Sequence, residues 1–188
     1  MHIGGPFSTP ALRTGINRSE GCDRMTTFSY PDRFLRDVLS RTRSIADVGV
    51  SPNPVRPSNY VARYLQRRGY RVFPVNPRHA GGEILGERVW PSLAALADSG
   101  AEVQMVDIFR RPEEAGGVVD EALEALLGRG LETVWMQIGV VDRAAAARAE
   151  AAGLAVVMDR CPKMEHQRLF GELRRAGINT GIVSSRLR

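Results

Sequence analysis

The regular alternation of short apolar runs with helical stretches constrains the fold of this chain more than any other sequence feature. Five apolar runs are strand candidates, at residues 45–50, 70–75, 103–109, 133–138 and 154–158. The stretches between them carry helical signals, at residues 58–68, 92–97, 113–127 and 142–152. Continuous apolar strands are typical of burial on both faces, and strands that alternate with helices form mostly parallel sheets. The pattern predicts an α/β fold: a mostly parallel sheet of about five to six strands, the sixth at 88–90, with helices on both faces.

The chain of 188 residues has room for one domain of ordinary size. Residues 1–24 are rich in Gly, Pro, Ser, Thr and Arg and have no hydrophobic period, a composition that seldom becomes ordered. We therefore expect a disordered N-terminal extension at 1–24 and one folded domain at 25–188, which opens with a short helix at 31–41. The moderately apolar segment 169–188 is a candidate to cover the sheet or to join two copies in a homodimer.

Composition and charge exclude several classes of protein. No apolar run approaches the roughly 20 residues that span a bilayer, so we expect no membrane insertion. The net charge of +5 suits phosphorylated small molecules, whereas the absence of Lys/Arg runs and zinc-finger spacing argues against a nucleic-acid partner. The two cysteines, Cys22 and Cys161, are too few for a disulfide framework and predict free thiols in the cytoplasm.

The loop after the first predicted strand, at residues 49–58, is a candidate phosphate site. Ligands of open parallel sheets bind at the carboxyl ends of the strands, near the point where strand order reverses. Gly49 permits close approach of a ligand, and Arg56 offers a charge-assisted bond to phosphate. The next helix directs its free N–H groups at the loop, with Ser58 as the expected N-cap. The alternative is an ordinary turn followed by a capped helix.

The later strand exits add a cation and apolar groups. After the second strand, an NAD-binding protein usually places an acid that holds the ribose hydroxyls, whereas this chain has Arg78. A cation there favours a phosphorylated ribose, as in NADP or the 3′-phosphate of coenzyme A. Phe109 and Arg110 follow the third strand, and Ile138 and Gly139 follow the fourth. The alternative is that the arginines are solvated and that Phe109 belongs to the core.

Six segments taken together resemble stand-alone CoA-binding domain proteins, which are similar to the N-terminal domain of the succinyl-CoA synthetase α subunit. The segments are Gly-Val-Ser-Pro-Asn-Pro-Val-Arg-Pro-Ser at 49–58, Val-Asn-Pro-Arg at 75–78, Ile-Leu-Gly at 84–86, Asp-Ile-Phe-Arg-Arg-Pro at 107–112, Trp-Met-Gln-Ile-Gly at 135–139 and Met-Asp-Arg-Cys at 158–161. They follow one another in order within residues 28–188. The resemblance implies a Rossmann-like domain that binds coenzyme A or acyl-CoA as its cofactor.

The same resemblance implies where the ligand lies. The pyrophosphate would lie along the first loop, the adenosine and its 3′-phosphate at the second exit, and the rest of the ligand along the third and fourth exits. The residues assigned to coenzyme A are Gly49, Val50, Ser51, Pro52, Asn53, Arg56, Ser58, Val75, Asn76, Pro77, Arg78, Phe109, Arg110, Ile138 and Gly139. Two features depart from the pattern. The first loop lacks a second glycine, and Asp47 stands inside a strand that is apolar in the family, so it needs a partner or a distorted strand.

Nothing in the sequence forms a recognisable catalytic or metal-binding set. In the synthetase a second domain supplies a phosphorylated histidine, and we expect no such domain here and interpret His166 as structural or surface. We expect a non-catalytic nucleotide-binding protein with a sensor, carrier or regulatory role. The alternatives are an NADP-dependent oxidoreductase, although no Tyr-x-x-x-Lys pair is evident, and a protein-interaction module with a decayed site. Cys161 follows a strand at the ligand edge, where it is either an inert buried thiol or a partner for a mixed disulfide with coenzyme A.

Overall fold

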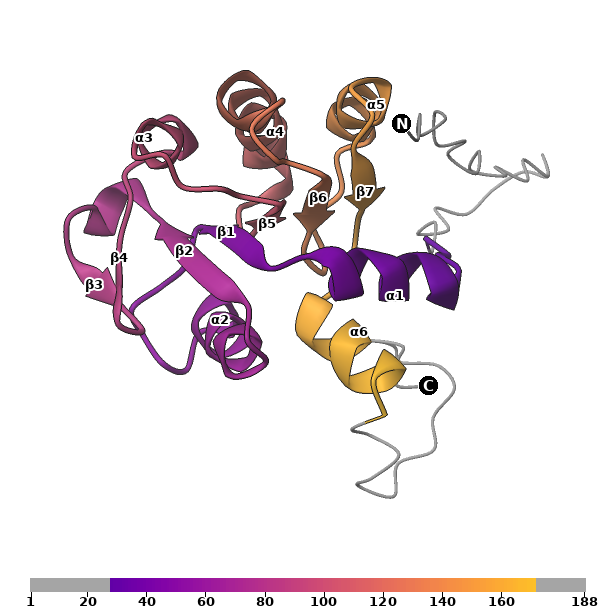
Figure 1. The fold of residues 1–188 in the computed structure, drawn as a ribbon, viewed down its shortest axis with the longest axis horizontal. Coiled ribbons are helices and arrows are strands. Elements are labelled where there is room, and N and C mark those ends of the chain that lie inside the picture. Colours follow the sequence, from indigo (N-terminus) through magenta and orange to yellow (C-terminus); the bar gives the residue numbers. More distant parts are fainter. Residues whose placement is uncertain (1–27, 172–188) are drawn as a thin grey trace, which may run out of the picture.

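A five-stranded parallel sheet with helices on both faces forms the centre of the protein (Figure 1). The computed structural model describes residues 28–171, so the expectation for residues 1–24 lies outside the described part. The strands are β1 (Ser44–Val48), β2 (Arg71–Val75), β5 (Met105–Ile108), β6 (Thr133–Met136) and β7 (Ala155–Val157). Their order in the sheet is β2-β1-β5-β6-β7, and every neighbouring pair is parallel. The predicted Rossmann-like α/β fold is confirmed.

Two layers of helices cover the sheet, one on each face. Nearly every strand residue is therefore buried, whichever face it points to. One layer consists of α3 (Leu93–Asp98), α4 (Pro112–Leu126) and α5 (Arg143–Ala151), and the other of α1 (Asp32–Arg41), α2 (Pro57–Arg67) and α6 (Pro162–Leu169) (Figure 1). Successive strand residues point to opposite faces. Accordingly, Ala46 and Val48 pack with the first layer, whereas Ile45 packs with the second.

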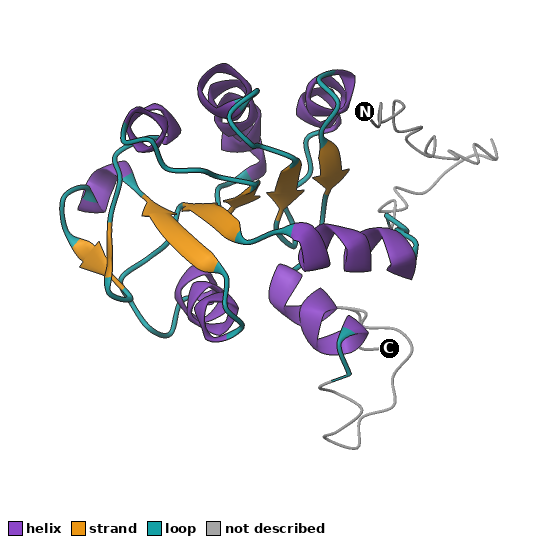
Figure 2. Cartoon of the chain, in the orientation of Figure 1, coloured by secondary structure: helices purple, strands orange, loops and turns teal. Residues whose placement is uncertain are grey.

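The short strand predicted at 88–90 is present in part, since Arg88 belongs to a small hairpin beside the sheet and Trp90 forms a single parallel bridge with Val75 of β2 (Figure 2). The hairpin pairs β3 (Glu83–Ile84) with β4 (Glu87–Arg88) in antiparallel fashion, after a short 3-10 helix, η1 (Pro77–His79). Leu85 and Gly86 form its two-residue turn with φ angles of 55° and 78°. Only Trp90 reaches the main sheet, where its N–H donates to Pro74 O (2.8 Å) and its carbonyl accepts from Asn76 N (2.9 Å).

Helix α2, which follows β1 along the chain, begins one residue earlier than predicted. Helix α2 starts at Pro57 with Arg56 in the N-cap position, so the expectation that Ser58 caps the helix is wrong. Proline is favoured at the first helical position because its fixed φ suits the helix and its missing N–H would have no partner there. The Ser58 hydroxyl instead accepts a hydrogen bond from Ser51 N (3.1 Å).

Within residues 28–171, no helix combines the length and apolar character that crossing a bilayer would require.

The strand order reverses between β1 and β5. From β1 the chain passes outward to the edge strand β2, and it then returns to the other side of β1 to form β5. The loops that leave the carboxyl ends of β1 and β5 therefore diverge, and a divergence of this kind opens a crevice for a ligand. The fold thus places the 49–58 loop and the Phe109–Arg110 segment next to each other at the carboxyl edge of the sheet, where ligands of such folds bind, and we call this part of the edge the crevice.

Candidate functional site

Gly49 is the point of closest approach between the two sides of the crevice. It has a φ of +99°, and a Cβ atom there would lie 2.5 Å from Phe109 O and 3.0 Å from Arg110 Cδ. Its N–H donates to Val75 O (2.9 Å), which ties the start of the loop to β2. Both the backbone angle and the lack of space require glycine at this position.

The rest of the loop is held by its own side chains. Ser51 Oγ accepts from Asn53 N (3.2 Å), and Asn53 Oδ1 accepts from Val55 N (3.1 Å). Asn59, which the sequence analysis did not select, donates from Nδ2 to Ser51 O (2.8 Å). The side chains of Ser51, Asn53 and Ser58 therefore satisfy backbone groups of the loop itself. Such bonds are the ones that a turn rich in proline needs, because three of its residues bring no N–H.

Asn76 joins the second strand exit to the first. Its Nδ2 donates to Val50 O (2.8 Å), and its Oδ1 accepts from Arg78 N (3.0 Å) at the start of η1. Asn76 is buried, whereas Pro77 and Arg78 are exposed. The amide side chain thus fixes the position of the backbone from which the Arg78 guanidinium extends.

Three arginines around the crevice take part in no ion pair within the described part of the chain. Arg56 and Arg78 are exposed, and Arg110 is half-buried. None of the ion pairs between residues that the structure describes involves any of the three. Uncompensated cations of one sign along a cleft concentrate anions there. The arrangement suits a ligand with more than one phosphate group.

The far side of the crevice is apolar. Phe109 is half-buried at the exit of β5, and Ile138, at the exit of β6, is 45% exposed. Gly139 has a φ of +81°, and its N–H donates to Asp159 Oδ1 (2.9 Å) at the exit of β7. The strand exits predicted from the sequence thus meet at one edge of the sheet, with cations at one side and apolar surface at the other.

Directly beneath the crevice lie two carboxyl groups of which the sequence analysis identified only one. Asp47 and Asp107 face each other across β1 and β5, and both are fully buried. Among the described residues neither oxygen of Asp47 has a hydrogen-bond partner, and its strand keeps regular pairing, so neither expected remedy is seen there. Burial is the largest cause that raises the pKa of both groups, to about 8 for Asp107. Gln137 Nε2 donates to both oxygens of Asp107 (3.0 and 2.9 Å) and opposes this shift.

Cys161 is buried beside this pair, and the structure favours an inert thiol. Only 7% of the residue is exposed, and burial raises the pKa of the thiol to about 11. We expect Cys161 in the folded protein to react with oxidised CoA at least 100-fold more slowly at pH 8 than in urea, because roughly one thiol in a thousand is ionised. Peptide mapping after timed labelling measures the rate at Cys161 separately from that at Cys22. Rapid formation of a Cys161 adduct in the folded protein would contradict this expectation.

His166 lies away from the crevice. His166 Nδ1 is 2.9 Å from Tyr64 Oη, and the imidazole stacks on Phe170 between α2 and α6, in agreement with a structural role.

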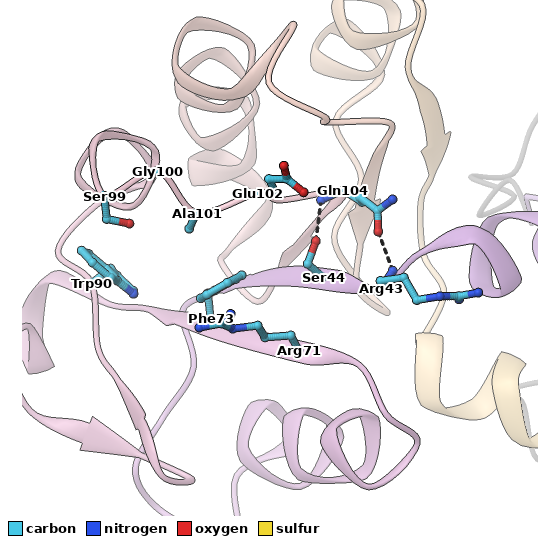
Figure 3. Close-up of a pocket in the computed structure, with 10 residues that line it drawn as sticks. All are labelled: Arg43, Ser44, Arg71, Phe73, Trp90, Ser99, Gly100, Ala101, Glu102 and Gln104. Carbon is cyan, nitrogen blue, oxygen red and sulfur yellow. Dashed lines mark hydrogen bonds between the residues drawn. The ribbon is translucent and has the colours of Figure 1, made fainter.

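A hollow of about 780 Å³ also lies away from the crevice, by the amino ends of β1 and β2, and is lined in part by Ser44 and Gln104 (Figure 3). These two are hydrogen-bonded to each other (3.2 Å). Because ligands of parallel sheets bind at the carboxyl edge, we take the crevice as the candidate site.

Comparison with known proteins gives a consistent result. The family model described as "CoA binding domain" matches residues 43–167. The uncharacterized protein YneT of Bacillus subtilis is 33% identical over 132 residues, which make up 70% of this chain and 91% of YneT. A solved structure from Thermus thermophilus is 39% identical with a TM-score of 0.67, and the match covers 75% of this chain and 100% of that one.

A more distant likeness shows the fold alone. The acetyl-coenzyme A synthetase 1 of Ca. Korarchaeum cryptofilum is 21% identical with a TM-score of 0.52, and the match covers 66% of this chain and 28% of the synthetase. The family match at residues 43–167 spans the 49–58 loop and the later strand exits, and the YneT match covers 70% of the chain. On these grounds the chain belongs to the CoA-binding domain family.

Proposed function

We propose that this protein binds coenzyme A or acyl-CoA in the crevice between β1 and β5, as a non-catalytic sensor, carrier or regulatory protein. The observation that carries the proposal is a set of three arginines, Arg56, Arg78 and Arg110, that form no ion pair with any residue between 28 and 171 and that stand around a turn that only glycine can form. The family to which the chain belongs supports the choice of coenzyme A among phosphorylated ligands.

Each part of the ligand has a matching part of the crevice. The amino end of α2 and Arg56 suit the pyrophosphate, because a helix N-terminus and a cation both attract anions. Arg78, which stands at the end of β2, suits the 3′-phosphate of the ribose. The half-buried Phe109 and the exposed Ile138 offer apolar contact to the pantetheine arm. A reducing compartment such as the cytoplasm is part of the proposal, since Cys161 is a free thiol.

Isothermal calorimetry with coenzyme A, dephospho-CoA, acetyl-CoA and NADP tests the proposal. We expect coenzyme A to bind about 10- to 100-fold more tightly than dephospho-CoA, because a hydrogen bond to a charged group contributes about 1.5–3 kcal/mol. Arg78→Ala is expected to remove most of this difference by weakening coenzyme A alone. Acetyl-CoA is expected to bind like coenzyme A, since the acyl group is far from the phosphates.

Arg67→Ala is the matched control, because it removes the same charge from an exposed residue at the other end of α2. It is expected to leave the ratio of the two affinities unchanged. Equal binding of coenzyme A and dephospho-CoA by the unaltered protein would mean that the 3′-phosphate is not recognised. Tight binding of NADP alone would favour the oxidoreductase alternative instead.

A further inference from the structure

Asp47 and Asp107, which are far apart in the sequence, lie side by side because β1 and β5 are neighbouring strands. The two residues are register partners on β1 and β5, and neighbouring strands lie about 4.8 Å apart. Ile45 and Met105, two residues earlier on each strand, pack against α1, α2 and α6, so both carboxyl groups point to that layer. Both are fully buried, which places two acids side by side in a medium of low dielectric constant.

The two carboxyl groups differ in what surrounds them. Asp107 receives both hydrogen bonds from Gln137 Nε2, a donor that favours a carboxylate. Neither oxygen of Asp47 has a hydrogen-bond partner within residues 28–171. On the far side of Asp107, the register partner Trp135 donates its indole N–H to Arg160 O (2.7 Å). Asp47 is therefore the member of the pair that must keep a proton.

No cation of the surrounding helices compensates the pair. On α6, Glu165 pairs with Arg168 (2.8 Å) and Arg160 (3.7 Å), and Arg168 also pairs with Asp32 of α1 (2.7 Å). Lys163 lies over the Tyr60 ring of α2 (5.2 Å).

The remaining titratable groups near this layer do not compensate the pair either. Tyr70 Oη donates to Leu39 O (2.8 Å), Tyr64 contacts His166 across α2 and α6, and Arg63 donates to Asn59 Oδ1 (2.8 Å). Cys161, at the start of α6, is the titratable neighbour that interacts with Asp107, and its buried thiol is neutral.

We propose that Asp47 and Asp107 hold a proton that is linked to occupancy of the crevice, so that a polyanionic nucleotide binds the protonated pair more tightly than the ionised pair. This inference rests on the proposed function and adds a regulation to the same site. The pair lies two residues before Gly49 and Phe109, and Gln137 directly precedes Ile138. A phosphate bound in the crevice therefore lies near the carboxyl groups, and its negative charge raises their pKa.

The direction of the linkage follows from charge. A negative ligand makes ionisation of Asp107 harder, so the bound protein holds more protons than the free protein near the pKa of about 8. Ligand binding then takes up protons, and affinity falls as pH rises through this range. One unit charge about 10 Å away, at an effective dielectric constant of about 20, shifts a pKa by roughly one unit, which limits the affinity change to about tenfold per charge.

Calorimetry of acetyl-CoA binding between pH 7 and 9, in two buffers with different ionisation enthalpies, measures both quantities. Acetyl-CoA has no thiol proton, and its 3′-phosphate has already ionised, since phosphate monoesters lose their second proton near pH 6. We expect the unaltered protein to take up about half a proton per ligand at pH 8 and to bind about three- to tenfold more weakly at pH 9 than at pH 7.

Asp107→Asn is the decisive variant, because it removes the carboxyl group whose pKa is about 8 and its amide cannot take up or release a proton between pH 7 and 9. It is expected to bind acetyl-CoA with little proton uptake and with an affinity that is flat from pH 7 to 9. Asp107→Val serves the same purpose if the asparagine variant does not fold. Uptake that is unchanged in these variants, or absent in the unaltered protein while acetyl-CoA binds, overturns the linkage and leaves the proposed function intact. Failure of the unaltered protein to bind at any pH would instead overturn both.

Discussion

Gly49→Ala is expected to lower the free energy of unfolding by about 2–4 kcal/mol and to weaken acyl-CoA binding more than tenfold. A backbone angle that L-residues avoid costs of order 1–3 kcal/mol, and the added methyl would also lie 2.5 Å from Phe109 O. A carbonyl oxygen of the backbone cannot rotate away as a flexible side chain can. The two sides of the crevice must therefore separate, which displaces the loop and Arg110 together. Thermal melting should show a fall of about 5–15 °C.

Two other glycines separate the causes of this loss. Gly153 has a φ of +87° but nothing within 4 Å of the added atom, so Gly153→Ala reports backbone strain alone. Gly117 lies within α4 without a positive φ and with open space, so Gly117→Ala should be neutral or slightly stabilising. Neither variant should alter acyl-CoA affinity. If Gly49→Ala loses no more stability than Gly153→Ala, the close approach to Phe109 contributes nothing.

Asp47→Val is expected to stabilise the folded protein by about 2–4 kcal/mol at pH 8. Burial of a polar group without a hydrogen bond costs about 1–3 kcal/mol in proteins, and valine, which has no such cost, suits the interior of a buried strand. The pKa values of Asp47 and Asp107 are raised in the folded state, so the folded protein keeps protons that the unfolded chain releases. The stability of the unaltered protein therefore falls as pH rises from about 4 through about 8.

Thermal melts at half-unit steps between pH 5 and 9 measure this effect. The gain from Asp47→Val should be small near pH 5 and largest above pH 8, with a residual slope from Asp107. Asp120→Val is the control, because Asp120 is exposed on α4 and its ion pair with Arg148 lies at the surface. Exposed pairs contribute at most about 1 kcal/mol. A melting temperature of Asp47→Val below that of the unaltered protein at pH 8 would show that Asp47 has a stabilising partner.

The sheet, the helices that cover it and the strand exits were predictable because they depend on local patterns. Runs such as Ile45–Val50 and Thr133–Ile138 contain enough apolar residues in sequence to identify buried strands, and glycine or proline marks where each run ends. The carboxyl edge of a parallel sheet then gathers those ends in one place. Which residues stand at this edge follows from this rule, whereas their assignment to coenzyme A came from the family resemblance and stays a prediction.

The features that were not predicted depend on contacts between distant residues or on weak turn signals. The hairpin turns at Leu85-Gly86, where leucine takes a φ that Asn or Asp usually supplies, so the usual turn signature is missing. Ser58 was expected to cap α2 because serine is a common N-cap residue. In the structure the helix begins at Pro57, and the Ser58 hydroxyl accepts from Ser51 N instead. The proximity of Asp107 to Asp47 could not be predicted without knowing that β1 and β5 are neighbouring strands, since 60 positions separate the two acids.

The internal bonding of the 49–58 loop bears on the kinetics of recognition. Its prolines and side-chain bonds fix the loop before any ligand arrives, so the entropy of ordering this segment is lost during folding rather than during association. A preorganised receptor of this kind requires little rearrangement in the encounter complex. Ligands that share the nucleotide portion should consequently arrive at similar rates, and discrimination among acyl chains should reside in how long each complex persists.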